Sequence, residues 1–216
     1  SSDVCSSDLD LSNFENLPTR DEARSRLSEY LALPEEKSII LYVGFSTPRK
    51  GVEYLARALK FLDEPVYLVM VGKWQSGYKE RFIQVLGQDN LEIVHLAGYI
   101  SESSLLDYYA VADVFVLPSL LEGFGIPLAE AMAAGLPVVT TTAGAADEVV
   151  GEAGLSVPPA DSRALADAIS NVLANPVLAE DLSMRGRARA SRLFSSEIAA
   201  AQMEAMLMRF QKVDSG

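Results

Sequence analysis

The sequence is poor in cysteine, histidine and basic residues. Its 216 residues include one cysteine, one histidine and 18 lysines and arginines, against 30 aspartates and glutamates. The single cysteine, Cys5, excludes an internal disulfide framework. A formal charge of −12 argues against a nucleic-acid binder, because such proteins need a basic surface. Any anionic ligand must be held by a local cluster of donors.

Long apolar runs are also absent. No stretch approaches the ~18 uninterrupted apolar residues of a membrane span. The N-terminus lacks the basic segment and apolar core of a signal peptide. We therefore expect a soluble, cytoplasmic chain. Membrane contact is not indicated in this part, and peripheral attachment at the inner membrane stays open for a full-length protein.

The first nine residues, SSDVCSSDL, have no hydrophobic period. They resemble translated adapter read-through, so we interpret residues 1–9 as a non-native segment and expect native sequence from about Asp10. A disordered tail rich in serine and aspartate is the alternative. Because no element begins in the first ten residues, we expect further sequence on the N-terminal side.

From Lys37 onward, β-rich runs alternate with amphipathic stretches of helical length, which is typical of βαβ units. Runs that are apolar on both faces favour a parallel sheet covered by helices. From Asp161 to Lys212 the pattern is helical throughout, with Pro176 between the first two helices. The sequence predicts one doubly wound, Rossmann-like α/β domain with a helical C-terminal extension. Strands are expected over 38–43, 66–71, 91–98, 113–118, 136–141 and 155–159, and helices over 52–62, 78–87, 103–112 and 127–135.

The stretch EGFGIPLAE, residues 122–130, follows the apolar run VFVLP. The run ends a strand, GFG makes a turn, and Pro127 begins a helix. Backbone N–H groups near Gly125 and Ile126 should therefore face the crevice at the carboxyl ends of the strands. Together with the helix dipole, these donors predict a phosphate site.

Glu122 and Glu130 flank this turn and need a separate reason, because a carboxylate beside a bound diphosphate is repelled. Carboxylates make charge-assisted hydrogen bonds to hydroxyl groups, and sugars present hydroxyls in pairs. We interpret both glutamates as hydroxyl acceptors. The alternative is a solvated loop acid at Glu122 and, at Glu130, a residue favoured only by the helix dipole.

A second turn, within VGFSTPRKGVEYL at residues 43–55, supplies positive charge. Arg49 and Lys50 stand at the start of its helix and should enter the same crevice. Lysine binds phosphate as a point charge and arginine as a planar fork. Solvated basic residues at a loop tip are the alternative.

Four segments carry a resemblance to a known family: VGFSTPRKGVEYL, HLAGYISESSLLDYYAVADVFVLPS, EGFGIPLAEAMAAGLPVVTT and AGAADEVVGEAGLSVPP. In this order and spacing, the chain is similar to the C-terminal, donor-binding half of retaining glycosyltransferases of family 4, also called glycosyl transferases group 1. These enzymes have the two-Rossmann-domain GT-B architecture. The resemblance implies that residues 10–216 form the donor domain and that an N-terminal acceptor domain is missing.

The resemblance also implies roles for individual residues. Glu122 contacts the donor sugar and, with Lys50 and Arg49, carries catalysis. Glu130 binds the nucleotide ribose. Many relatives have arginine where this chain has Phe45, and Arg49 is expected to substitute for it. The other donor-binding positions implied are Gly44, Phe124, Gly125 and Ile126 near the phosphates, and Tyr99 and Ile100 beside the base.

The implied reaction is sugar transfer from a UDP-, GDP- or ADP-linked donor to an acceptor hydroxyl, with retention at the anomeric carbon. The acceptor, a glycan, lipid or small molecule, would bind through the missing domain. We expect no cofactor and no metal, because no carboxylate cluster has metal-ligand spacing. Two alternatives remain: a non-catalytic nucleotide-sugar-binding module, and a dehydrogenase that uses GFGIPL as a dinucleotide turn, although Leu128 replaces the third glycine.

Three other features have less specific interpretations. His95, the single histidine, is expected to be structural and not a proton relay. The basic residues of MRGRARASR, 184–192, are expected to form a solvated face and not an anion site. The methionine-rich stretch 199–210 is expected to pack against a core or an interdomain surface.

Overall fold

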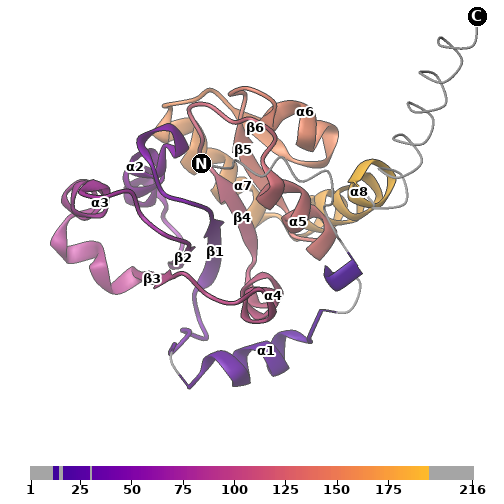
Figure 1. The fold of residues 1–216 in the computed structure, drawn as a ribbon, viewed down its shortest axis with the longest axis horizontal. Helices are drawn as coiled ribbons and strands as arrows, with labels where there is room; N and C mark the ends of the chain where they lie inside the picture. Colours follow the sequence, from indigo (N-terminus) through magenta and orange to yellow (C-terminus); the bar gives the residue numbers. More distant parts are fainter. Residues whose placement is uncertain (1–11, 15–16, 30, 195–216) are drawn as a thin grey trace, which may run out of the picture.

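The computed structural model describes residues 12–14, 17–29 and 31–194. The predictions for residues 1–9, with Cys5, and for residues 199–210 lie outside these ranges. Within them, six parallel strands form one sheet in the order β3-β2-β1-β4-β5-β6 (Figure 1). The predicted doubly wound α/β fold is confirmed. The strands are β1 (Ser38–Val43), β2 (Val66–Val71), β3 (Val94–Gly98), β4 (Val114–Leu117), β5 (Val138–Thr141) and β6 (Leu155–Val157).

Helices cover both faces of the sheet (Figure 1). On one face α2 contacts α3 and α7, while on the other α4 contacts α1 and α5, and α5 contacts α8. The α-helices are α1 (Arg20–Leu27), α2 (Val52–Ala58), α3 (Tyr78–Leu86), α4 (Glu102–Val111), α5 (Ile126–Ala134), α6 (Ala146–Val150), α7 (Ser162–Ala174) and α8 (Pro176–Phe194). Short 3₁₀ turns are η1 (Ser12–Phe14), η2 (Pro48–Lys50), η3 (Leu59–Phe61), η4 (Gln88–Ile93) and η5 (Gly151–Ala153).

Local sequence explains where most of these helices begin and end. Thr19 and Glu22 form a reciprocal capping box at the start of α1, and the Ser101 side chain accepts from the Ser104 amide at the start of α4. Gly87 ends α3 with a φ of 87°, a conformation that glycine adopts without strain.

Several predicted elements and bounds differ from the structure. Residues 91–93 belong to η4 and not to the third strand, which begins at Val94. The helix predicted over 52–62 ends at Ala58 and continues as η3. Helices α1 and α6 were not predicted, because α1 buries only Ala23 and Leu27 and α6 is five residues long. Neither is long or apolar enough to give a helical period.

The turns after β1 and β4 are held against each other at the carboxyl edge of the sheet. The Arg49 carbonyl accepts the Leu120 amide at 2.7 Å and the Leu121 amide at 3.2 Å. Gly51, with a φ of 63°, lies so close to the other turn that an added Cβ would be 2.1 Å from the Pro118 oxygen. This contact stands where the strand order reverses, the place at which open α/β sheets bind ligands.

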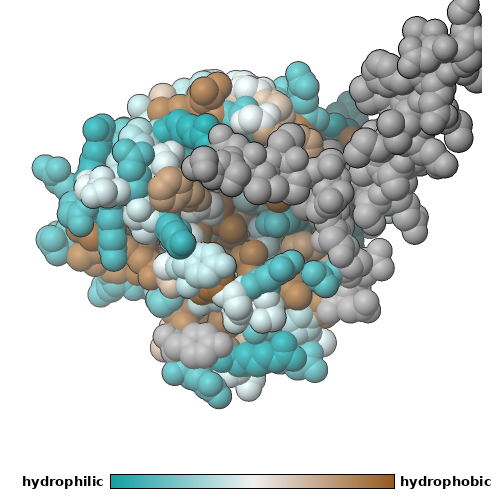
Figure 2. Space-filling model, in the orientation of Figure 1, coloured by the Kyte–Doolittle hydropathy of each residue, from teal (hydrophilic) through white to brown (hydrophobic). Residues whose placement is uncertain are grey.

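Polar side chains cover much of the surface seen in Figure 2, and apolar ones show in a recess near its centre. In the described part of the chain, no helix is both long and apolar enough to span a membrane.

The close approach of Gly51 predicts a large effect of a single methyl group. Gly51→Ala should lower the free energy of unfolding by roughly 3 kcal/mol or more, because it adds backbone overlap to the left-handed φ. Gly77→Ala is the matched control. Gly77 has a φ of 74° but nothing within 4 Å of an added Cβ, so only the conformational cost of about 1 kcal/mol is expected. Urea unfolding measures both, and equal losses would contradict the packing explanation.

Candidate donor-binding site

The predicted site residues gather at the carboxyl edge of the sheet. Gly44 follows β1, Lys50 ends η2, Glu122 lies in the turn after β4, and Glu130 lies in the middle of α5. Tyr99 follows β3 and is 76% exposed. The predicted site residues therefore lie in the turns that follow β1, β3 and β4 and on α5.

Lys50 and Glu122 form an ion pair that the sequence did not predict. Lys50 Nζ lies 2.6 Å from Glu122 Oε2, and the two side chains are only 13% and 8% exposed. The buried Ser119 hydroxyl donates to the same oxygen at 2.8 Å. The Gly123 amide donates to Oε1 at 3.2 Å. Glu122 is thus not a solvated loop acid, and that alternative is wrong.

Two glycines allow the chain to turn around Glu122. A Cβ on Gly144, which has a φ of 64°, would lie 2.1 Å from the Glu122 carbonyl oxygen. A Cβ on Gly125, with a φ of 79°, would lie 2.8 Å from Leu128 Cδ1 and 3.3 Å from Glu122 Cγ. The Ala145 amide also donates to the Glu122 carbonyl at 3.2 Å. The carboxylate is fixed from its backbone as well as from its oxygens.

Glu130 has a different environment on α5. The hydroxyl of Tyr109, a residue of α4, donates to Glu130 Oε2 at 2.8 Å. Burial raises the pKa of Glu130 above its ordinary value, the hydrogen bond from Tyr109 opposes this shift, and the charge of Glu102 adds to it. An acid whose pKa is raised by folding destabilises the fold at pH values above that pKa. Glu130 therefore costs stability at neutral pH, which is common at functional sites.

The start of α5 supplies backbone donors to the same edge. Gly125 is the N-cap, Pro127 stands in the first turn, and the Leu128 amide donates to the Gly125 carbonyl at 2.8 Å. The first amides of an α-helix have no acceptor within the helix and carry its positive dipole end. Phe124 and Ile126 flank the cap on either side. The helix begins at Ile126, one residue before the predicted start at Pro127.

Arg49 and Lys73 add positive charge. Arg49 is exposed on η2. Lys73 follows β2 and lies with its Nζ 4.9 Å from the centre of the Tyr99 ring, a cation–π contact. The sequence did not single out Lys73, although its place two residues after a predicted strand was a usable signal. The sequence did not single out Ser119 either, although it lies two residues after β4 and so had the same signal. Tyr109 lies within a helix, away from any strand end, and had no such signal.

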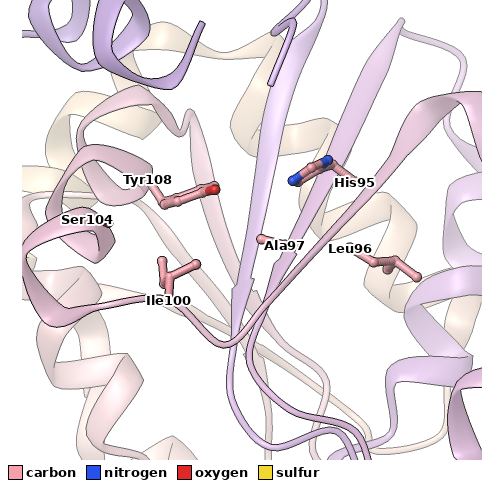
Figure 3. A pocket seen from close by; sticks show the side chains of 6 residues that line it. All are labelled: His95, Leu96, Ala97, Ile100, Ser104 and Tyr108. Carbon is pink, nitrogen blue, oxygen red and sulfur yellow. The ribbon is translucent and has the colours of Figure 1, made fainter. Parts of the chain in front are cut away.

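A pocket of about 250 Å³ lies between β3 and α4, beside Ile100. Figure 3 shows His95 and Tyr108 pointing toward each other across it, while Leu96 points away. Burial lowers the pKa of His95, which favours the uncharged imidazole. The remaining lining residues are Ala97 and Ser104. In the described part of the chain, no three His, Cys, Asp or Glu residues are grouped to hold a metal ion.

Comparison with known proteins identifies the family. The protein family described as "Glycosyl transferases group 1" matches residues 23–189 of this chain. The chain belongs to this family. It is 38% identical over 174 residues to an MMP alpha-(1->4)-mannosyltransferase of Mycolicibacterium hassiacum, covering 78% of this chain and 42% of the relative. It is 34% identical over 205 residues to a D-inositol 3-phosphate glycosyltransferase of Xylanimonas cellulosilytica, covering 91% and 48%.

Solved structures agree in fold. Sucrose-phosphate synthase from Thermosynechococcus elongatus superimposes with a TM-score of 0.81 at 35% identity, covering 94% of this chain and 51% of that one. Anabaena HepE, solved in complex with UDP-glucose, gives a TM-score of 0.79 at 24% identity, covering 93% and 55%. The chain thus spans about half the length of the relatives it matches. Its fold is that of the C-terminal domain of GT-B glycosyltransferases, and membership in the family sets aside the dehydrogenase alternative.

The buried ion pair predicts a stability cost when either partner is removed. Lys50→Met should lower the free energy of unfolding by about 3 kcal/mol, because it leaves a buried carboxylate without its cation. Adding Glu122→Gln should recover part of the loss, so the two changes are not additive. Arg185→Met is the control: Arg185 pairs with Asp181 at 2.8 Å, but the side chains are 53% and 39% exposed, so less than about 1 kcal/mol is expected. Additive losses at Lys50 and Glu122 would refute the coupling.

Proposed function

We propose that this chain binds a nucleotide sugar and forms the donor-binding part of a retaining glycosyltransferase of family 4. The buried Lys50–Glu122 pair beside the start of α5 carries the proposal, because it brings a cation, a hydroxyl acceptor and backbone donors to one edge. Relatives named as sugar transferases and a structural neighbour solved with UDP-glucose support it. On this proposal residues 10–216 form the donor domain, and a further domain binds the acceptor.

Glu130 is assigned to the ribose hydroxyls of the donor. Its carboxylate is partly desolvated, and among the described residues Tyr109 is the one that donates a hydrogen bond to it, on Oε2. Oε1 is assigned to a ligand hydroxyl. A charge-assisted hydrogen bond in this environment is stronger than one in water.

Lys50 is assigned to the donor phosphates and Glu122 to the donor sugar. Lys50 and Ser119 donate from their side chains to Glu122 Oε2, whereas within the described residues Oε1 accepts the adjacent Gly123 amide. A sugar hydroxyl can thus approach Oε1 while Lys50 stays near Oε2. Arg49 adds a second cation, and the backbone at Gly44, Phe124, Gly125 and Ile126 is assigned to the phosphates. Tyr99 and Ile100 are assigned to the border of the base.

Catalysis on this proposal comes mainly from stabilising the leaving group. Charge develops on the diphosphate as the bond to the anomeric carbon breaks. Lys50, Arg49 and the start of α5 would stabilise that charge, since they are positioned before the reaction begins. Transfer to an acceptor hydroxyl with retention and without a bound metal is part of the proposal.

Calorimetric titration with UDP, GDP, ADP and their sugars tests the donor assignment. One of these nucleotides should bind, and EDTA should leave its dissociation constant unchanged. Glu130→Gln should weaken that nucleotide well over fivefold, because losing a charged acceptor costs about 1.5 to 3 kcal/mol. The variant should be no less stable than the parent at neutral pH, since Glu130 is a desolvated acid. An unchanged dissociation constant for Glu130→Gln would contradict the assignment of Glu130 to the ribose.

The 216-residue chain alone should bind the nucleotide weakly and transfer no sugar. Transfer requires an acceptor held within reacting distance and the exclusion of water, which domain closure provides in enzymes of this kind. With the crevice open to solvent, we expect affinity between roughly micromolar and millimolar. Sugar transfer above buffer hydrolysis, abolished by Lys50→Ala, would show instead that this chain holds a complete catalytic centre.

A further inference from the structure

We infer that Tyr109 is a positioning residue: it orients the Glu130 carboxylate toward the ribose of the donor nucleotide. The inference rests on the proposed function and adds a residue that the resemblance does not include. It begins from the 2.8 Å hydrogen bond that the Tyr109 hydroxyl donates to Glu130 Oε2.

Tyr109 cannot serve as a direct ligand contact, because its side chain is buried, with 1% of the residue exposed. Its ring is fixed by two aromatic neighbours from other elements. Phe14 of η1 meets it edge-on with ring centres 5.5 Å apart, and Phe115 of β4 stacks against it at 6.0 Å. The hydroxyl therefore has one position, set by packing and independent of any ligand.

A fixed donor on one oxygen determines what the other oxygen can do. Tyrosine has a single hydroxyl proton, and here it points to Oε2. Oε2 is thereby held in place, and Oε1 is the oxygen assigned to the ligand. Glu102, the acidic neighbour on α4, repels the Glu130 charge, so the Tyr109 hydrogen bond is the opposing contribution that favours the ionised form.

The competing explanation is that this hydrogen bond only stabilises the packing of α4 against α5. Its loss would then lower the stability of the fold and weaken the binding of every ligand of the crevice alike. A positioning role affects only ligands that carry ribose hydroxyls. Comparing a nucleotide with its 2′,3′-dideoxy form separates the two explanations.

The test uses Tyr109→Phe in the full chain and the member of UDP, GDP and ADP that the parent binds most tightly. We expect the dissociation constant to rise about fivefold for the ribonucleotide and less than twofold for its 2′,3′-dideoxy form. Tyr67→Phe is the matched control. Tyr67 is a half-buried tyrosine near the start of β2, at the opposite end of the strands, and its removal should change neither constant.

A second measurement covers the case in which the dideoxy form binds too weakly to quantify. Tyr109→Phe added to Glu130→Gln should weaken the ribonucleotide less than twofold beyond Glu130→Gln alone, since the group that it positions is already altered. Equal weakening of both ligands, no weakening of either, or a full additional loss in the double variant would overturn the inference. A parent chain that binds none of the three nucleotides would instead overturn the proposed function.

Discussion

The contact between Gly51 and the Pro118 carbonyl determines how the rest of the crevice is built. Only a residue without a Cβ can bring the β1 turn this close to the β4 turn. The Arg49 carbonyl then links the two turns by accepting hydrogen bonds from the Leu120 and Leu121 amides. Lys50, the next residue along η2, is carried into contact with Glu122, 72 positions away in the sequence. The ion pair is therefore a consequence of backbone packing at the point where strand order reverses.

The charged groups at the carboxyl edge of the sheet do not maximise the stability of the fold. Desolvation of a buried ion pair often offsets the attraction between its charges, and Glu130 carries a charge that folding disfavours. Each carboxylate is nevertheless supported by a buried hydroxyl, Ser119 for Glu122 and Tyr109 for Glu130. On the proposed function, the fold gives up stability to hold these two acids in fixed orientations toward the donor.

Local patterns were enough to predict the sheet and the turn that starts α5, because strand apolarity, Pro127 and the glycines act within a few residues. The bounds of β1 and β2 agree residue for residue with the apolar runs 38–43 and 66–71. The Lys50–Glu122 contact could not be predicted in this way, since it depends on β1 and β4 being neighbours. Tyr109 was equally out of reach, because its partner is set by the packing of α4 on α5.

The overall charge of the chain limits the kind of anion that the carboxyl edge of the sheet can bind. At −12, the surface as a whole repels anions, and the cations of the crevice oppose this field locally. Lys50 is mostly buried, so salt screens it less than an exposed lysine, and Lys73 is held against the Tyr99 ring. A small anion can sit within this short range and gain their attraction. A long polyanion would have to extend over the acidic surface beyond it, so the charge distribution agrees with the compact anionic ligand of the proposed function.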